Sequence, residues 1–193
     1  MRQKISLEIF TYWNELRGSA AAPLRADVTP ASIRHILPHL FILQAGQDKT
    51  PRFRLAGTAI CTAFGRELRE EGFASFWAKE QSADPVKISE SVMEHALPTL
   101  INATGHGIGG RRMAFEMVLL PLRSAPDICD RILGCLAPAS TTPWLSTEPL
   151  GYLSLDGSRA LVRRPTDTDA PQSRGNGLRR RSASMPRMHR SDA

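Results

Sequence analysis

The chain has 193 residues, enough for one domain with extensions, and 41% of them are hydrophobic. Its formal net charge of +6 is concentrated near one end, because residues 163–193 carry eight arginines against three aspartates, a net +5. The basic balance therefore does not indicate a nucleic-acid-binding fold. The chain also lacks an apolar run of membrane-spanning length and the apolar core of a secretory signal, so we expect a cytoplasmic protein with no membrane insertion.

The first predicted element is an amphipathic helix over residues 4–17, which ends at Gly18. Leu7 and Phe10 extend its apolar side beyond what one neighbouring element normally covers. Uncovered apolar surface of this kind is typical of an interface, so we expect a homodimer with Leu7, Phe10 and Trp13 as candidate interface residues. The alternative is a helix wholly absorbed by its own domain.

Strands and short helices are predicted next. Thr29-Pro30 is typical of a helix start, and the helix would run to Ile36. Strands are predicted over 39–46 and from Pro51, where FRLA alternates apolar and charged residues. Gly57 then breaks the second strand, and a short helix follows that ends at Gly65.

The second half begins with a helix predicted over residues 85–100, followed by ATGHGIGGRR, which we interpret as a loose connection. Residues 112–123 and 130–140 are apolar runs of strand length and predict a central hairpin, with Pro121 closing its first strand. Residues 149–164 predict a further strand or packing segment. The stretch beyond Arg164 has too few large apolar residues to order itself, so a disordered tail is predicted.

This order of elements predicts an α+β fold, an antiparallel sheet with helices on one face. Strand, glycine, short helix, glycine and a second short helical segment over 53–76 resemble the front half of a PAS domain. More specifically, the blocks IFTYWNELRG, PHLFILQ, RFRLAGTAIC, FGREL and FEMVLLPLR…DRILGCLAP resemble a family of short bacterial stand-alone PAS-type proteins, long catalogued as a domain of unknown function.

The resemblance implies a PAS-like antiparallel five-stranded sheet with helices on one face, an extra N-terminal helix and a disordered C-terminal tail. We divide the chain into an N-terminal amphipathic helix and linker (1–24), a PAS-like domain (25–140), a C-terminal extension of that domain (141–163) and a disordered Arg-rich tail (164–193). The family implies a role in bacterial signalling and supplies no catalytic residues. We therefore expect a non-catalytic sensory or regulatory module that binds a small ligand, a signalling-protein partner, or both.

A ligand would lie between the sheet and the short helices, although every candidate residue there is also an ordinary core residue. No cofactor is identified from the sequence. The candidate cavity residues are Phe41, Leu43, Phe53, Leu55, Ile60, Phe64, Met93, Leu97, Phe115, Met117, Leu133 and Cys135.

The polar residues give only weak support for cofactor or metal binding. His95, on the long predicted helix, lies where some PAS domains place a haem ligand, but a lone helical histidine is more often a solvated side chain. His35 and His39 are separated by Pro38, so their side chains should diverge and no metal site is predicted. Glu116 is the only acid in its apolar strand, and we expect it on the solvent or dimer side of the sheet.

The other polar features bear on cysteine chemistry, catalysis and the tail. Three cysteines, Cys61, Cys129 and Cys135, lack paired spacing, and Cys61 and Cys135, which lie among apolar residues, predict buried thiols. Nucleophile-elbow, P-loop and HExxH motifs are absent, so no catalytic residues are assigned.

The LRRRSAS run at 178–184 leaves one alternative function open. In this alternative the protein is a regulator that contacts nucleic acid or an anionic surface through the tail, with weak binding that depends on salt.

Overall fold

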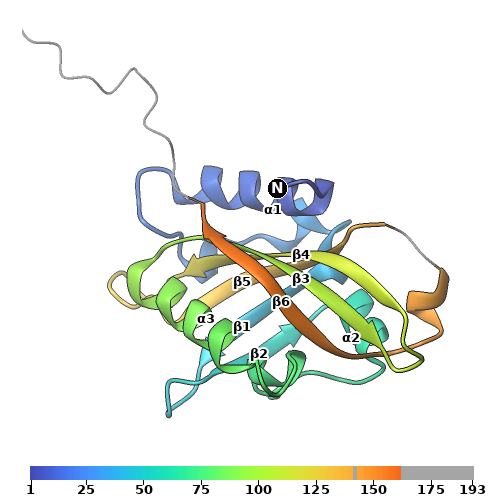
Figure 1. The fold of residues 1–193 in the computed structure, drawn as a ribbon. Coiled ribbons are helices and arrows are strands. Elements are labelled where there is room, and N and C mark those ends of the chain that lie inside the picture. Colours follow the sequence, from blue (N-terminus) through green and yellow to red (C-terminus); the bar gives the residue numbers. More distant parts are fainter. Residues whose placement is uncertain (141–142, 162–193) are drawn as a thin grey trace, which may run out of the picture. The chain divides into compact units, whose positions relative to one another are not determined.

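Six antiparallel strands form one sheet in the computed structural model, which describes residues 1–140 and 143–161 (Figure 1). Their order across the sheet is β2-β1-β5-β4-β3-β6. The predicted five-stranded sheet is therefore one strand short, because β6 pairs along β3. The strands are β1 (Leu40–Ala45), β2 (Pro51–Ala56), β3 (Thr99–Gly107), β4 (Arg112–Leu122), β5 (Arg131–Pro138) and β6 (Leu150–Ala160).

Helices lie on both faces of this sheet (Figure 1). The face against α2 (Thr58–Phe64) and α3 (Ala83–His95) is called the inner face, and the face against α1 (Lys4–Arg17) is called the outer face. The prediction of helices on one face holds for α2 and α3, and α1 is the predicted extra N-terminal helix. Short 3-10 helices connect these elements: η1 (Arg25–Asp27), η2 (Pro30–Ile33), η3 (Leu37–His39), η4 (Phe73–Phe76) and η5 (Pro143–Ser146).

The helix α1 begins and ends as its sequence predicts. Gly18 follows it with a φ of 55°, a left-handed conformation that glycine adopts without steric penalty. Ile9 and Trp13 are buried against the sheet, and the indole N–H of Trp13 donates to the carbonyl oxygen of Pro121 at 2.8 Å. These contacts hold α1 on the outer face, within the compact unit Met1–Val162 that includes the sheet.

The helix predicted over residues 85–100 is confirmed as α3 but ends five residues earlier, and the loose connection predicted after it is wrong. The helix α3 ends at His95 because Ala96 takes a left-handed φ of 49°, and β3 begins at Thr99. Pairing with β4 on one side and β6 on the other makes the glycine-rich stretch a strand. Gly105 is required there, since a Cβ at this position would lie 2.5 Å from the Phe115 ring.

The central hairpin is confirmed, with Val118 opposite Cys135 in the β4–β5 pair. Pro121 does not close β4 but lies inside it, opposite Ile132. The short helix predicted over 30–36 is the 3-10 helix η2. The predicted disorder beyond Arg164 lies outside the described residues, and the four-part division of the chain stays a prediction. Among the described helices, none is both long and apolar enough to cross a membrane.

Candidate functional site

Five phenylalanines fill the space between the inner face and its helices, where a PAS-type ligand cavity was predicted. Stacking is closest between Phe64 and Phe76, whose ring centroids are 4.2 Å apart with an interplanar angle of 5°. Phe53 lies 4.5 Å from Phe76, and Phe41 lies 5.6 Å from Phe53. Phe73 completes the set, 5.9 Å from Phe53. We call these five residues the aromatic layer, and each is buried.

Glycine in the adjacent strand makes room for this layer. Gly134 of β5 lies opposite Phe41 of β1, and a Cβ there would lie only 2.1 Å from the Phe41 ring. The ring therefore lies across the backbone of β5. Any side chain at residue 134 would push Phe41 into its aromatic neighbours, so the glycine is part of how the inner face is filled.

The structure brings together eight of the twelve predicted cavity residues. They share the inner-face core: Phe41, Leu43, Phe53, Ile60, Phe64, Met93, Phe115 and Met117. Leu133 and Cys135 are buried on the outer face, because in β5 it is Ile132 and Leu136 that point inward. Side chains alternate faces along a strand, so choosing a position one residue off selects the wrong face.

The remaining two, Leu55 and Leu97, are exposed. In β2 the register shifts opposite Ile42 and Leu43, so that Phe53 pairs with Leu43 whereas Leu55 pairs with Ile42. Such a bulge turns the following side chain to the other face. Leu55 therefore lies on the outer face with 49% of its side chain exposed. Leu97 lies beyond the end of α3, in the turn that leads into β3.

His95 is exposed at the last position of α3, where its Nδ1 lies 3.3 Å from the hydroxyl of Ser91. It does not contribute to the aromatic layer. A polar group that the sequence reading missed is the indole of Trp77, which packs on Phe73 at 5.8 Å. Its Nε1 is buried without a hydrogen-bond partner among the described residues.

Glu116 lies on the outer face, but it is buried rather than on a solvent side, with 6% exposed. Its carboxylate accepts the backbone N–H groups of Arg2 at 2.6 Å and Gln3 at 3.0 Å, just before α1. Burial alone would raise the pKa of Glu116. The hydrogen bonds from these two amides and from the Ser6 hydroxyl together lower it by more, so the pKa lies below its ordinary value. Glu116 thus satisfies free amides at the start of α1.

The three predicted interface residues of α1 differ in how accessible they are. Leu7 is 56% exposed, and Phe10 is half-buried with its ring 6.1 Å from that of Trp13. Trp13 is 2% exposed and packs within its own domain. Of the three, only Leu7 presents most of its side chain outward.

An apolar groove of about 410 Å³ opens on the outer face beside α1. We call it the outer groove. Strands β1 and β2 form one side, and residues 25–38 form the other. Among the residues that the structure describes, Arg25 and Arg34 are the only charged ones that line it, and no aspartate or glutamate does. The apolar residues lining it include Ile33, Leu37, Leu40, Ile42, Leu55 and Leu133.

A second pocket on the outer face, of about 400 Å³, is polar and carries both signs of charge. Arg2, Glu116, Asp156 and Arg159 line it, between the start of α1 and strands β3, β4 and β6. Glu116 already accepts two backbone N–H groups here, and Asp156 accepts the hydroxyl of Thr104 at 2.8 Å. Both carboxylates of this pocket thus have hydrogen-bond partners within the fold.

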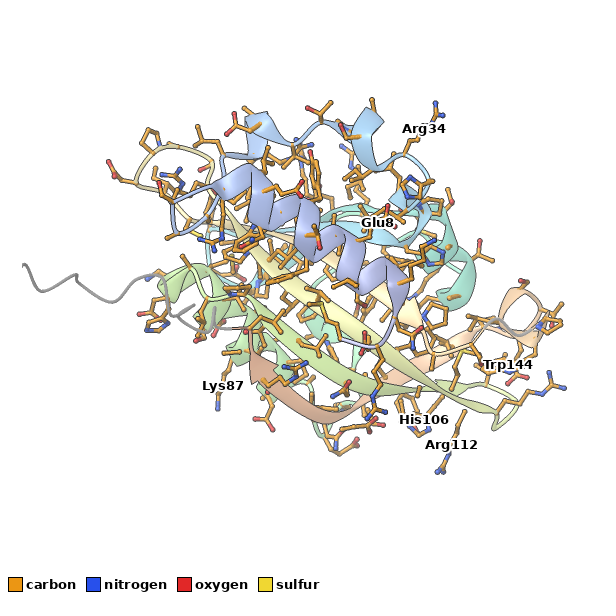
Figure 2. The ribbon with its side chains drawn as sticks, turned by 90° about the horizontal axis from the view of Figure 1, so that it is seen from above. Glu8, Arg34, Lys87, His106, Arg112 and Trp144 are labelled. Atoms are coloured by element: carbon orange, nitrogen blue, oxygen red, sulfur yellow. The ribbon has the colours of Figure 1, made fainter. Side chains whose placement is uncertain are left out.

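The histidines that the structure describes lie in separate parts of the fold and do not form one site. His35 contacts Glu8, and burial lowers the pKa of His39. The rings of His106 and Tyr152 are stacked with their centroids 4.6 Å apart, and Figure 2 shows His106 close to Arg112. Within residues 1–140 and 143–161, no three His, Cys, Asp or Glu side chains are grouped to hold a metal ion.

All three cysteines are free. Of the two predicted buried thiols, Cys135 is fully buried and Cys61 is only half-buried, as is Cys129. Burial raises the pKa of Cys135 to about 12. Its thiol therefore stays protonated at neutral pH and acts as an apolar core group.

An antiparallel sheet with short helices and α3 packed on its inner face defines an α+β fold. A protein-family model described as PAS domain matches residues 1–137, and the chain belongs to this family. PAS domains are signalling or sensory modules, so the resemblance noted in the sequence is confirmed at that level. The match includes α1 but ends before β6, the additional strand. No curated protein matches the chain.

Proposed function

We propose that this PAS domain is a non-catalytic regulatory module that acts by associating with other protein chains. The observation that carries the proposal is the aromatic layer, in which the centroid of the Phe76 ring lies 4.5 Å from that of Phe53 and 4.2 Å from that of Phe64. A close-packed interior leaves binding to be done by the surface. PAS domains commonly mediate dimerisation or protein interaction, which supports the same function.

Native mass spectrometry and an absorbance spectrum of freshly purified protein test this proposal. We expect the mass of the bare chain and no Soret or flavin band. A bound small molecule of stoichiometric amount would contradict the proposal and favour a ligand sensor, with the unpartnered Nε1 of Trp77 as the first group to examine. In that case Trp77→Phe should weaken retention of the bound molecule.

A homodimer through α1 is part of the proposal. Leu7 supports it, because a leucine with 56% of its side chain exposed on a helix is readily covered by a second copy. Light scattering at tens of micromolar should give a dimer for the wild type and a monomer for Leu7→Asp. Ile108→Asp, at an exposed isoleucine in the turn between β3 and β4, is the matched control. A wild-type monomer would remove α1 from the interface.

The alternative rests on the sequence of residues 163–193, which lie outside the described residues. Their net +5 favours contact with nucleic acid or an anionic surface. Such binding releases counterions, so it should weaken steeply as salt is raised. Replacing Arg179, Arg180 and Arg181 by serine in the full chain should abolish it, and unchanged DNA or RNA binding would reject this alternative.

A further inference from the structure

We propose that the outer groove docks an apolar peptide segment with acidic side chains, supplied by a signalling partner of this module. The inference rests on the proposed function, association with other chains, and adds where the partner binds and what chemistry it presents. The site lies between β1 and β2 on one side and residues 25–38 on the other.

The groove is apolar and has the capacity for several side chains. Its volume of about 410 Å³ is bounded by leucine, isoleucine and proline side chains, with Thr58 as the one uncharged polar side chain among its lining residues. Leu55, turned outward by the bulge in β2, is 49% exposed at its edge. Exposed apolar surface that continues an apolar groove marks a site where a partner can bind.

The walls of the groove are held in place by backbone contacts. The N–H of Gly57 donates to the carbonyl oxygen of Leu40 at 2.8 Å, which joins the end of β2 to the start of β1. At Gly57 a Cβ would lie 2.3 Å from the carbonyl oxygen of Leu37, so the two walls meet with no side chain between them. A site that is already formed requires little ordering when a partner binds.

Charge determines which partner fits. Arg25 and Arg34 have no carboxylate within 4.0 Å among the described residues, and Figure 2 shows Arg34 extending away from the ribbon. Two free guanidinium groups at an apolar groove favour Asp or Glu side chains flanking apolar anchors.

The same charges argue against this chain's own Arg-rich segment as the occupant. Residues 163–193 carry a net +5, so they would bring like charge to Arg25 and Arg34. The groove therefore suits a segment of another protein better than it suits the end of this one.

Selection of a random displayed-peptide library on the full-length protein tests the proposal without a known partner. We expect enriched peptides to combine two or more large apolar residues with Asp or Glu. Synthetic versions should lose affinity by about tenfold or more for Leu55→Glu and for the double variant Arg25→Glu, Arg34→Glu. Ile128→Glu, at an exposed isoleucine outside the groove, is the matched control and should bind as the wild type does.

A charge swap sharpens the test. A peptide whose acidic residues are replaced by lysine should fail on the wild type and bind the Arg25→Glu, Arg34→Glu variant. The proposal is overturned if no peptide is enriched, if enriched peptides are basic, or if Leu55→Glu leaves binding unchanged. It is also overturned if Leu55→Glu converts a wild-type dimer to a monomer, because the occupant would then be a second copy. A bound small molecule in the native mass spectrum would instead contradict the proposed function.

Discussion

The two faces of the sheet are closed in different ways. The inner face is filled by the aromatic layer, whose five rings all come from residues 41–76. The outer face is covered by α1, which reaches it from the start of the chain. There, Glu116 accepts two backbone N–H groups and Trp13 donates to Pro121, contacts between residues more than 100 positions apart.

Because of this difference, we assign stability mainly to the inner face and partner binding to the outer face. A layer of interlocked rings has no low-energy rearrangement, because moving one ring displaces its neighbours. The outer face is held by the apolar packing of α1, with Ile9 and Trp13 buried, together with these polar contacts, and it leaves the outer groove open. We therefore expect substitutions on the inner face to unfold the domain and substitutions at the outer groove to change binding with the fold intact.

The largest expected effect is at the centre of the aromatic layer. Phe76→Ala removes a fully buried ring that contacts both Phe53 and Phe64, and it should lower the free energy of unfolding by about 3–5 kcal/mol. Urea denaturation followed by circular dichroism measures the change. Ile108→Ala, at a position 72% exposed, is the control and should change it by about 0.5 kcal/mol or less. A small loss for Phe76→Ala would mean that the layer is loosely packed.

The second effect concerns the attachment of α1. Trp13→Phe keeps an aromatic ring beside Phe10 but removes the N–H that donates to Pro121. The carbonyl of Pro121 then lacks its partner, and we expect the free energy of unfolding to fall by about 1–3 kcal/mol. Hydrogen exchange of the backbone amides over residues 4–17 should accelerate. Thr11→Ala on the exposed side of α1 should leave both measurements as in the wild type.

Local patterns in the sequence predicted much of the fold. Helix α1, strands β1 and β2 and the β4–β5 hairpin follow from apolar periodicity and from glycine at their ends. Strand β3 could not be found this way, because its TLINATGHG sequence has weak strand propensity. It is a strand because β4 and β6 pair with it on both sides, and pairing between distant segments overrides propensity.

The candidate site was harder to predict, for reasons that particular residues show. The bulge that turns Leu55 outward depends on the register with β1, which the alternation in FRLA does not reveal. In β5 the inward positions are Ile132, Gly134 and Leu136, and an apolar run does not reveal which of its alternating positions face inward. The partners of Glu116 lie 113 and 114 residues away, so a single acid in an apolar strand gave no sign of its role.

The third prediction tests Glu116 by its pH dependence. Since its folded pKa lies below the ordinary value of 4.5, its contribution to stability is present above that pH and is lost as the pH falls through the lower folded pKa. At neutral pH, Glu116→Gln should lower the free energy of unfolding by about 1–2 kcal/mol. The difference in the free energy of unfolding between the variant and the wild type should become smaller below pH 4.5. The exposed Glu94→Gln is the control, and a gap that does not depend on pH would contradict the role assigned to the carboxylate.

The smallest expected effect sharpens the comparison within a single strand. Leu55 and Phe53 are two residues apart in β2, yet the bulge places Phe53 in the aromatic layer and Leu55 at the outer groove. Leu55→Glu should therefore change the free energy of unfolding by about 1 kcal/mol or less, since half of the side chain is already in water. Phe53→Glu would bury a charge among rings and should abolish folding. Urea denaturation of both variants decides: a Leu55→Glu protein that fails to fold would place Leu55 in the core, and the outer groove would then lose its exposed anchor.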